Sequence, residues 1–168
     1  MDFSSLPTGS LRVFALSSFD NATPADYVTW AESALLTGLD SPALRVLAGF
    51  DPRQLTALFE VRSYFARALN ELNIALPGPE AIVRQYVHEV VEELAAGRRE
   101  PGDALATIHA VAIVPLSHPH DLQPWCDLGD GLDPVTRIPF GVENIGARTL
   151  EFAKSWLRGR ENPRGGAA

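Results

Sequence analysis

The residues with the most chemistry lie close together in a proline-rich stretch, residues 115–140. His118 and His120 are separated by one proline, and Cys126 follows six residues later. Imidazole and thiolate are good Zn²⁺ ligands, and His109 offers a fourth such group. Zinc modules, however, pair their ligands at C-x-x-C or H-x-x-x-H spacing, which this stretch lacks. We therefore expect two surface histidines and a buried thiol, with no metal and no cofactor bound.

Aspartates are the second chemical feature of this stretch. They are Asp121, Asp127, Asp130 and Asp133. Their spacing lacks the alternating oxygen ligands and the distal glutamate of a calcium-binding EF-hand loop, and aspartate with glycine is typical of turns. An acidic surface loop also suits a basic protein partner, to which Trp125 offers an aromatic anchor.

Three glutamates, Glu89, Glu92 and Glu93, form a further candidate surface opposite the apolar stripe of a predicted helix. Paired carboxylates can carry acid–base catalysis, but nothing in the sequence places a partner near them, and a solvated face is the default interpretation. We keep them among the candidate partner-binding residues. The full set is His118, His120, Asp121, Trp125, Asp127, Asp130, Asp133, Glu89, Glu92 and Glu93.

The chain lacks the motifs by which catalysis is usually recognised. It has no G-x-S-x-G, no P-loop, no H-E-x-x-H, and no G-x-G-x-x-G after a strand. Cys126 with His118 or His120 is a pair of the thiolate–imidazole type. One cysteine among several histidines is a frequent coincidence, so we expect no enzymatic activity and assign no catalytic residue.

Apolar residues recur at helical spacing through most of the chain. The pattern predicts helices over residues 24–37, 42–48, 52–73, 80–96, 101–114 and 142–160. We expect an all-α fold, a single-domain bundle of about five to six helices with a short buried helix and one long Pro-rich loop. Residues 1–22 are expected to form an irregular arm with a short strand or apolar arm at 11–16, residues 23–160 the helical domain, and residues 161–168 a flexible tail.

Residues 37–52 carry the clearest local signals. Gly38 and Gly49 stand where helices end, and Ser41-Pro42 supplies an N-cap followed by proline at the first helical position, as does Asp51-Pro52. These signals predict a helix–turn–helix–turn–helix corner. Because the helix over residues 42–48 is short and apolar, we expect it to be buried on most sides.

Such a corner can also read DNA as a helix-turn-helix, which we keep as the alternative. A recognition helix presents several polar or basic side chains to bases and phosphates. The helix over residues 42–48 offers only Arg45, and Asp40 and Asp51 lie on either side of it. DNA binding would need a basic patch formed by Arg45, Arg53 and the C-terminal arginines.

Charge and cysteine content narrow the function classes. The net charge is −7, and residues 1–130 carry seventeen acidic and eight basic side chains. An acidic surface repels phosphate, so nucleic acid is an unlikely ligand, whereas a basic protein fits. A single cysteine permits no internal disulfide. No stretch approaches the ~20 apolar residues that cross a bilayer. We expect a cytoplasmic protein without a membrane partner.

Residues 30–49, WAESALLTGLDSPALRVLAG, carry one resemblance. The pattern W-A, then L-L-x-G-x-D-S-x-x-L-x-x-L-A-G, resembles that of small uncharacterised bacterial all-α proteins. The resemblance implies no activity, but some of these proteins look like immunity proteins of toxin systems, which are small, cytosolic and acidic. The sequence thus predicts a non-enzymatic bacterial protein-interaction module, with an immunity protein against a basic toxin as its sharpest form.

Overall fold

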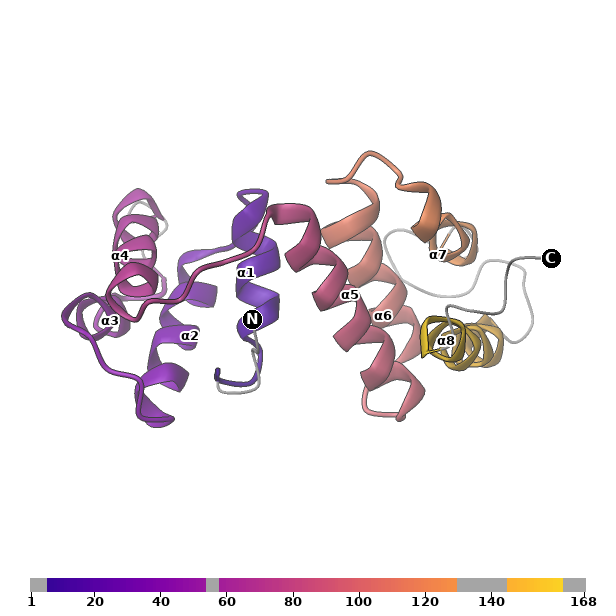
Figure 1. The fold of residues 1–168 in the computed structure, drawn as a ribbon, viewed down its shortest axis with the longest axis horizontal. Helices are drawn as coiled ribbons and strands as arrows, with labels where there is room; N and C mark the ends of the chain where they lie inside the picture. Colours follow the sequence, from indigo (N-terminus) through magenta and orange to yellow (C-terminus); the bar gives the residue numbers. More distant parts are fainter. Residues whose placement is uncertain (1–5, 54–57, 130–144, 162–168) are drawn as a thin grey trace. The chain divides into compact units, whose positions relative to one another are not determined.

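Helices account for nearly all of the regular structure. The computed structural model describes residues 6–53, 58–129 and 145–161, and within these ranges it contains eight α-helices and no strand (Figure 1). The all-α prediction is confirmed. Two helices, α1 and α7, exceed the six predicted ones. In chain order the helices are α1 (Ser10–Ser18), α2 (Pro24–Leu36), α3 (Pro42–Ala48), α4 (Leu58–Glu71), α5 (Pro79–Ala95), α6 (Pro101–Ile108), α7 (Gln123–Gly129) and α8 (Ile145–Glu161).

The chain divides into two compact units, Met1–Val83 and Arg84–Ala168, where we expected one helical domain over residues 23–160. Helices α1 to α4 belong to the first unit; α6 to α8 and most of α5 belong to the second. Pro77-Gly78-Pro79 lies shortly before the division, and a helix cannot run through such a sequence unbroken.

An aromatic cluster forms the core of the first unit. The Phe65 ring of α4 lies 4.8 Å from Tyr27, 5.0 Å from Trp30 and 6.0 Å from Phe14, measured between ring centroids. All four side chains are buried. Tilted and edge-to-face contacts of this kind add to the free energy of apolar burial, so the cluster holds α1, α2 and α4 together.

Residues Ser10–Ser18 form the helix α1, which corrects the expected irregular arm with a short strand or apolar arm at 11–16. Val13, Phe14 and Ala15 of α1 are buried. The Ser10 hydroxyl donates to the Pro7 carbonyl at 2.7 Å and accepts from Trp30 Nε1 of α2 at 3.0 Å. A short apolar run is compatible with either a strand or a helix, and here packing against α2 selects the helix.

The predicted corner between α2 and α3 is confirmed in its caps. Gly38 follows α2 with a left-handed φ of 90°, and the Leu39 N–H donates to the Ala34 carbonyl at 3.0 Å, as in a Schellman motif. Ser41 Oγ accepts from the Leu44 N–H at 3.2 Å, and Pro42 is the first helical residue.

The burial predicted for α3 is only partly right. Ala43, Leu44 and Leu47 are fully buried, but Val46 is 45% exposed. Arg45 lies on the surface, where it pairs with Asp40. The helix therefore packs through one face and leaves the other in solvent.

The helix predicted to start at Pro52 begins later. Pro52 and Arg53 lie in a turn, where Asp51 Oδ1 accepts from the Arg53 N–H at 3.0 Å, and the described part of α4 begins at Leu58. The aspartate thus stabilises a turn in place of a helix N-cap, a role for which its short side chain is equally suited.

Glu71 of α4 caps the N-terminus of α3, although it belongs to another helix. Its Oε2 accepts from the Ala43 N–H at 2.8 Å, and its Oε1 accepts from Arg67 Nε at 2.8 Å. The pKa of Glu71 is lowered, chiefly by the hydrogen bond from the Ala43 backbone. Partial burial acts in the opposite direction, and hydrogen bonds from Arg67 and Ser41 lower the pKa further. A lowered pKa in the folded state stabilises the protein above the pKa of the unfolded chain, and this contribution disappears as pH falls through the folded-state pKa.

Glu71→Gln is therefore expected to lower the melting temperature at pH 7 and to matter progressively less towards pH 3. The reason is that a protonated glutamate and a glutamine interact alike with the Ala43 N–H. Thermal unfolding followed by circular dichroism at several pH values measures the effect. Glu32→Gln, on an exposed position of α2, is the control and should leave the melting temperature unchanged. A difference between wild type and Glu71→Gln that does not narrow at low pH would contradict this role.

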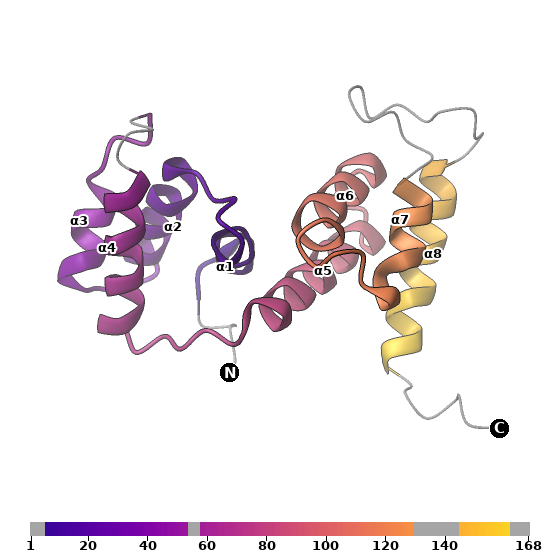
Figure 2. The same ribbon diagram turned by 90° about the horizontal axis from the view of Figure 1, so that it is seen from above.

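In the second unit, α5 and α6 run alongside each other (Figures 1 and 2). The turn between them contains Gly97, with a φ of 71°, and the Arg98 N–H donates to the Glu93 carbonyl at 2.8 Å. Helix α6 was predicted to reach residue 114, but it ends at Ile108 and continues as a π-helical turn, His109–Ile113. Among the described helices none is both long enough and apolar enough to span a membrane.

Candidate functional site

The predicted Pro-rich loop contains a helix in its described part. After the left-handed residues Ser117 and His118, a 3₁₀ turn, His120–Leu122, leads directly into α7. Leu122 and Trp125 are three residues apart and both almost fully buried, so this segment has a core-facing side. The loop prediction is wrong for this part. Asp130 and Asp133 lie outside the described residues.

Trp125 is a core residue, which corrects its expected role as an exposed anchor. It is 2% exposed, and its ring makes edge-to-face contacts with Phe152 at 4.8 Å and Trp156 at 5.9 Å. Its indole Nε1 has no hydrogen-bond partner among the described residues. Trp125 thus packs α7 against α8 through its ring.

The histidines and the cysteine come partly together. His118 and His120 are exposed, Cys126 is buried, and the Cys126 Sγ lies 3.9 Å from His118 Nδ1. Within the described ranges, no three His, Cys, Asp or Glu side chains are grouped closely enough to hold a metal ion. Of the predicted histidine–cysteine group, the structure brings together the buried Cys126 thiol and the His118 imidazole.

Two of the candidate acids in this unit form ion pairs, and a third accepts a local hydrogen bond. Asp121 pairs with Arg84 at the start of the unit. Glu93 Oε2 lies 2.7 Å from Arg99 Nε. Asp127 accepts from the Gln123 side-chain amide at 3.0 Å and remains exposed. The ion pairs of Asp121 and Glu93 weaken the attraction of these two acids for a basic partner. Asp127 keeps its negative charge without an ion pair to another described residue.

The glutamates of α5 differ from one another, although we expected one solvated face. Glu92 is 56% exposed, with His88 Nδ1 at 3.7 Å from its Oε2. Glu89 is half-buried, and its Oε2 is buried without a hydrogen-bond partner among the described residues. Burial, followed by the negative charge of Glu93, raises the pKa of Glu89. The sequence does not predict this, because the burial depends on the packing around α5.

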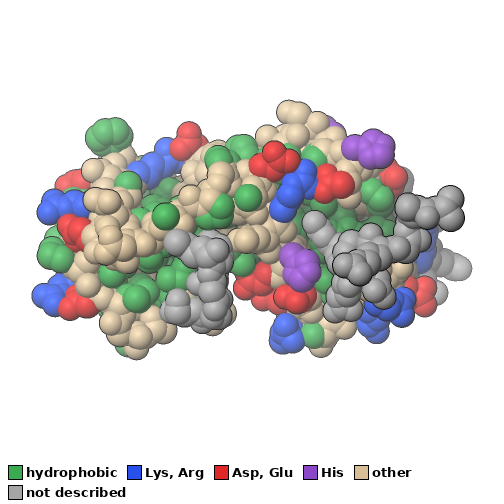
Figure 3. All heavy atoms as spheres, viewed as in Figure 1, with side chains coloured by type: hydrophobic (Ala, Val, Ile, Leu, Met, Phe, Trp, Pro, Cys, Tyr) green, Lys and Arg blue, Asp and Glu red, His purple; other side chains and the backbone are tan. Residues whose placement is uncertain are grey.

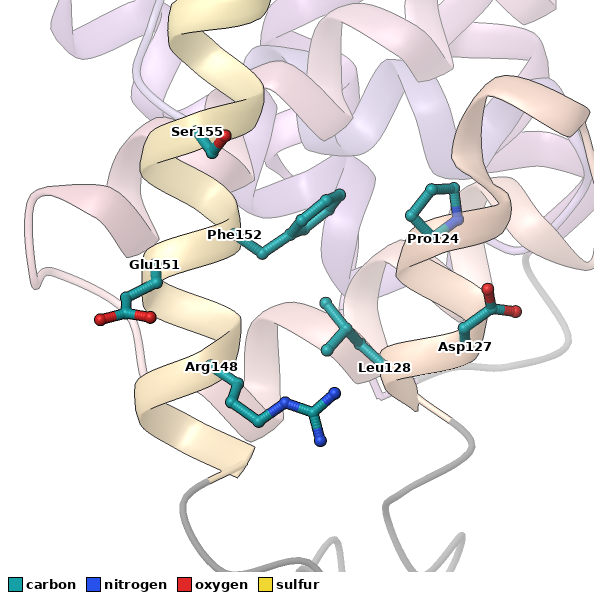
Figure 4. Close-up of a pocket in the computed structure, with 7 residues that line it drawn as sticks. All are labelled: Pro124, Asp127, Leu128, Arg148, Glu151, Phe152 and Ser155. Carbon is teal, nitrogen blue, oxygen red and sulfur yellow. The ribbon is translucent and has the colours of Figure 1, made fainter.

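A groove between α7 and α8 in the second unit combines apolar and charged residues, whereas a hollow of similar volume beside Arg99 is lined by polar and charged residues alone. We call the former the α7–α8 groove; its volume is about 500 Å³, within the range of ligand-binding clefts. Pro124, Leu128 and Phe152 form its apolar part (Figure 4). Asp127, Arg148, Glu151 and Ser155 complete its lining. Of the predicted site residues that the structure describes, only Asp127 lines it.

The α8 side of the groove was missed by sequence reasoning. Arg148, Glu151, Phe152 and Ser155 are spaced three, one and three residues apart and so share one face of the helix. The sequence predicts the helix over residues 142–160, but it does not single out the polar residues on this face. Their spacing was the available signal, whereas the opposing helix α7 was not predicted at all.

The fold and the groove define a helical protein with a surface cleft of mixed apolar and charged lining. Comparison of the chain with protein-family models, with curated proteins and with solved structures finds no match.

Proposed function

We propose that the chain is a non-enzymatic, cytoplasmic protein-interaction module whose partner is a basic protein. Its sharpest form is an immunity protein that neutralises a basic bacterial toxin. The α7–α8 groove supports the proposal best, because an apolar floor between charged edges is typical of a site where one protein receives a segment of another.

The edges of the groove favour a cationic partner. Asp127 on α7 and Glu151 on α8 are both exposed, and they point outwards on opposite sides of the groove (Figure 4). Neither forms an ion pair with another described residue. Exposed charges at the rim of an interface mainly speed up association and select partners by charge. The net charge of −7 acts in the same direction.

On the face drawn in Figure 3, acidic and basic side chains lie next to each other across the described surface. Arg12, Arg62 and Arg67, for example, pair with Asp26, Asp20 and Glu71. Paired charges attract an outside partner weakly. The unpaired carboxylates at the α7–α8 groove therefore matter more to the proposal than the overall count of acids.

The proposal predicts that reversing both rim charges weakens partner binding. The double variant Asp127→Lys, Glu151→Lys should bind the basic protein encoded beside this chain at least tenfold more weakly, about 1.4 kcal/mol, mainly through slower association. Surface plasmon resonance at 50 and 300 mM salt measures the rates, and the wild-type association rate should fall at the higher salt.

Charge alone is controlled by Glu32→Lys, Glu60→Lys, which changes the net charge equally at exposed positions of α2 and α4. This control should stay within about twofold of wild type. If both double variants bind the partner equally weakly, the attraction is non-specific and the groove has no special role. If the wild type does not bind the basic protein, the proposal is refuted.

The alternative, a helix-turn-helix that binds DNA, rests on the α2–α3 corner. The exposed face of α3 carries one cation, Arg45, whose guanidinium pairs with Asp40. A recognition helix needs free donors for bases and phosphates. This pairing favours the protein-docking proposal over the DNA-binding one.

A further inference from the structure

One cation is directed across the α7–α8 groove. The Arg148 side chain extends from α8 towards Leu128 of α7, while Glu151, three residues further along α8, points away (Figure 4). Arg148 is exposed and forms no ion pair with any described residue. Its guanidinium is therefore available to a ligand in the groove. A guanidinium favours a carboxylate, which it binds through two parallel hydrogen bonds.

The apolar part of the groove is short. Helix α7 has seven residues, which span about 10 Å at the α-helical rise. Phe152 reaches across the groove towards Pro124, and Leu128 lies next to Arg148 (Figure 4). The groove thus places a short apolar surface beside one cation, a pairing that suits an apolar side chain next to a carboxylate. A chain end carries these two groups on a single residue.

We propose that the α7–α8 groove receives the C-terminus of the basic partner. Its last side chain is apolar and packs on Phe152 and Leu128, and its terminal carboxylate binds Arg148. Basic residues just before the terminus lie near Asp127 and Glu151, which accounts for acids at the edges of a groove that contains a cation. The inference rests on the proposed function and specifies the part of the partner that is bound.

Short fluorescein-labelled peptides test this on the full chain. The probe is Gly-Lys-Lys-Ala-Leu with a free carboxylate, compared with the same peptide amidated at its C-terminus and with Gly-Lys-Lys-Glu-Leu amide. Fluorescence anisotropy should show the free acid binding at least tenfold more tightly than either amide. Arg148→Gln should remove this preference, whereas Arg158→Gln, at an exposed position nearly three turns further along α8 and outside the groove lining, should keep it.

The outcomes separate the inference from the proposed function. Equal binding of acid and amide, or equal binding of the peptide with an internal glutamate, overturns the C-terminal assignment. If the peptides bind equally but the double variant Asp127→Lys, Glu151→Lys no longer binds them, the proposed docking of a basic partner is retained and only the C-terminal assignment is lost. No binding by the free acid at millimolar concentration also overturns the inference. The comparison of wild-type binding to acid and amide needs no variant, so a misfolded Arg148→Gln protein leaves the test intact.

Discussion

Phe65→Ala is expected to destabilise the protein by about 3–5 kcal/mol, the usual cost of removing a buried phenyl ring. Phe65 is 5% exposed and contacts the rings of Phe14, Tyr27 and Trp30, which come from α1 and α2. Alanine leaves a cavity that three rigid rings cannot fill by small movements, so the cost should lie at the upper end of this range. Urea denaturation followed by circular dichroism measures the free energy of unfolding.

Helix α4 contains a matched control for this experiment. Phe59 lies on the same helix but is 88% exposed, so Phe59→Ala makes the same chemical change without a cavity. We expect its effect to stay within about 0.5 kcal/mol. Similar losses from the two substitutions would mean that the aromatic cluster does not form the core of this unit.

Local signals explain which parts of the fold are predictable from the sequence. The caps of the α2–α3 corner depend on residues within five positions of one another, such as Ser41 with Leu44 and Leu39 with Ala34. Their geometry is therefore determined by a short segment of sequence, and the caps were predicted correctly. The hydrogen bond from the Ala43 N–H to Glu71, by contrast, joins residues 28 positions apart, and no residue near Ala43 predicts it.

The elements that were missed depend on distant partners. The apolar run in α1 is compatible with a strand until Trp30 contacts Ser10 and Phe14. Prolines precede helix α7 and one lies within it, and the helix has too few residues for a visible period. It packs against α6 and the π-helical turn, and through Trp125 against α8. A segment of seven residues gains most of its helical stability from tertiary packing, so its own sequence is weak evidence.

The candidate site shows the same limit. Asp127 was singled out for its charge, and it does line the groove. Trp125 was expected outside because tryptophan is common in docking surfaces, yet its neighbours on α8 bury it. Arg148 has no unusual sequence context, and its importance arises only from the place of α8 beside α7. Which residues face a groove is decided by two helices together.

Trp125→Ala is expected to cost about 3–5 kcal/mol, because it removes the ring that packs against both Phe152 and Trp156. Since these contacts attach α7 to α8, the variant should also lose the α7–α8 groove and with it the preference for the free-acid peptide. Urea denaturation gives the free energy of unfolding, and anisotropy with the peptide gives the state of the groove.

A pair of tryptophan-to-phenylalanine substitutions separates ring packing from hydrogen bonding. Trp30 Nε1 donates to Ser10 Oγ, whereas Trp125 Nε1 is buried without a partner among the described residues. Trp125→Phe thus removes a buried donor that is not satisfied there, and Trp30→Phe breaks a hydrogen bond, so Trp30→Phe should cost more by about 1 kcal/mol. Equal costs would mean that the Trp125 N–H is bonded in solution, and a hydrogen bond would then add to the packing of α7 against α6, the π-helical turn and α8.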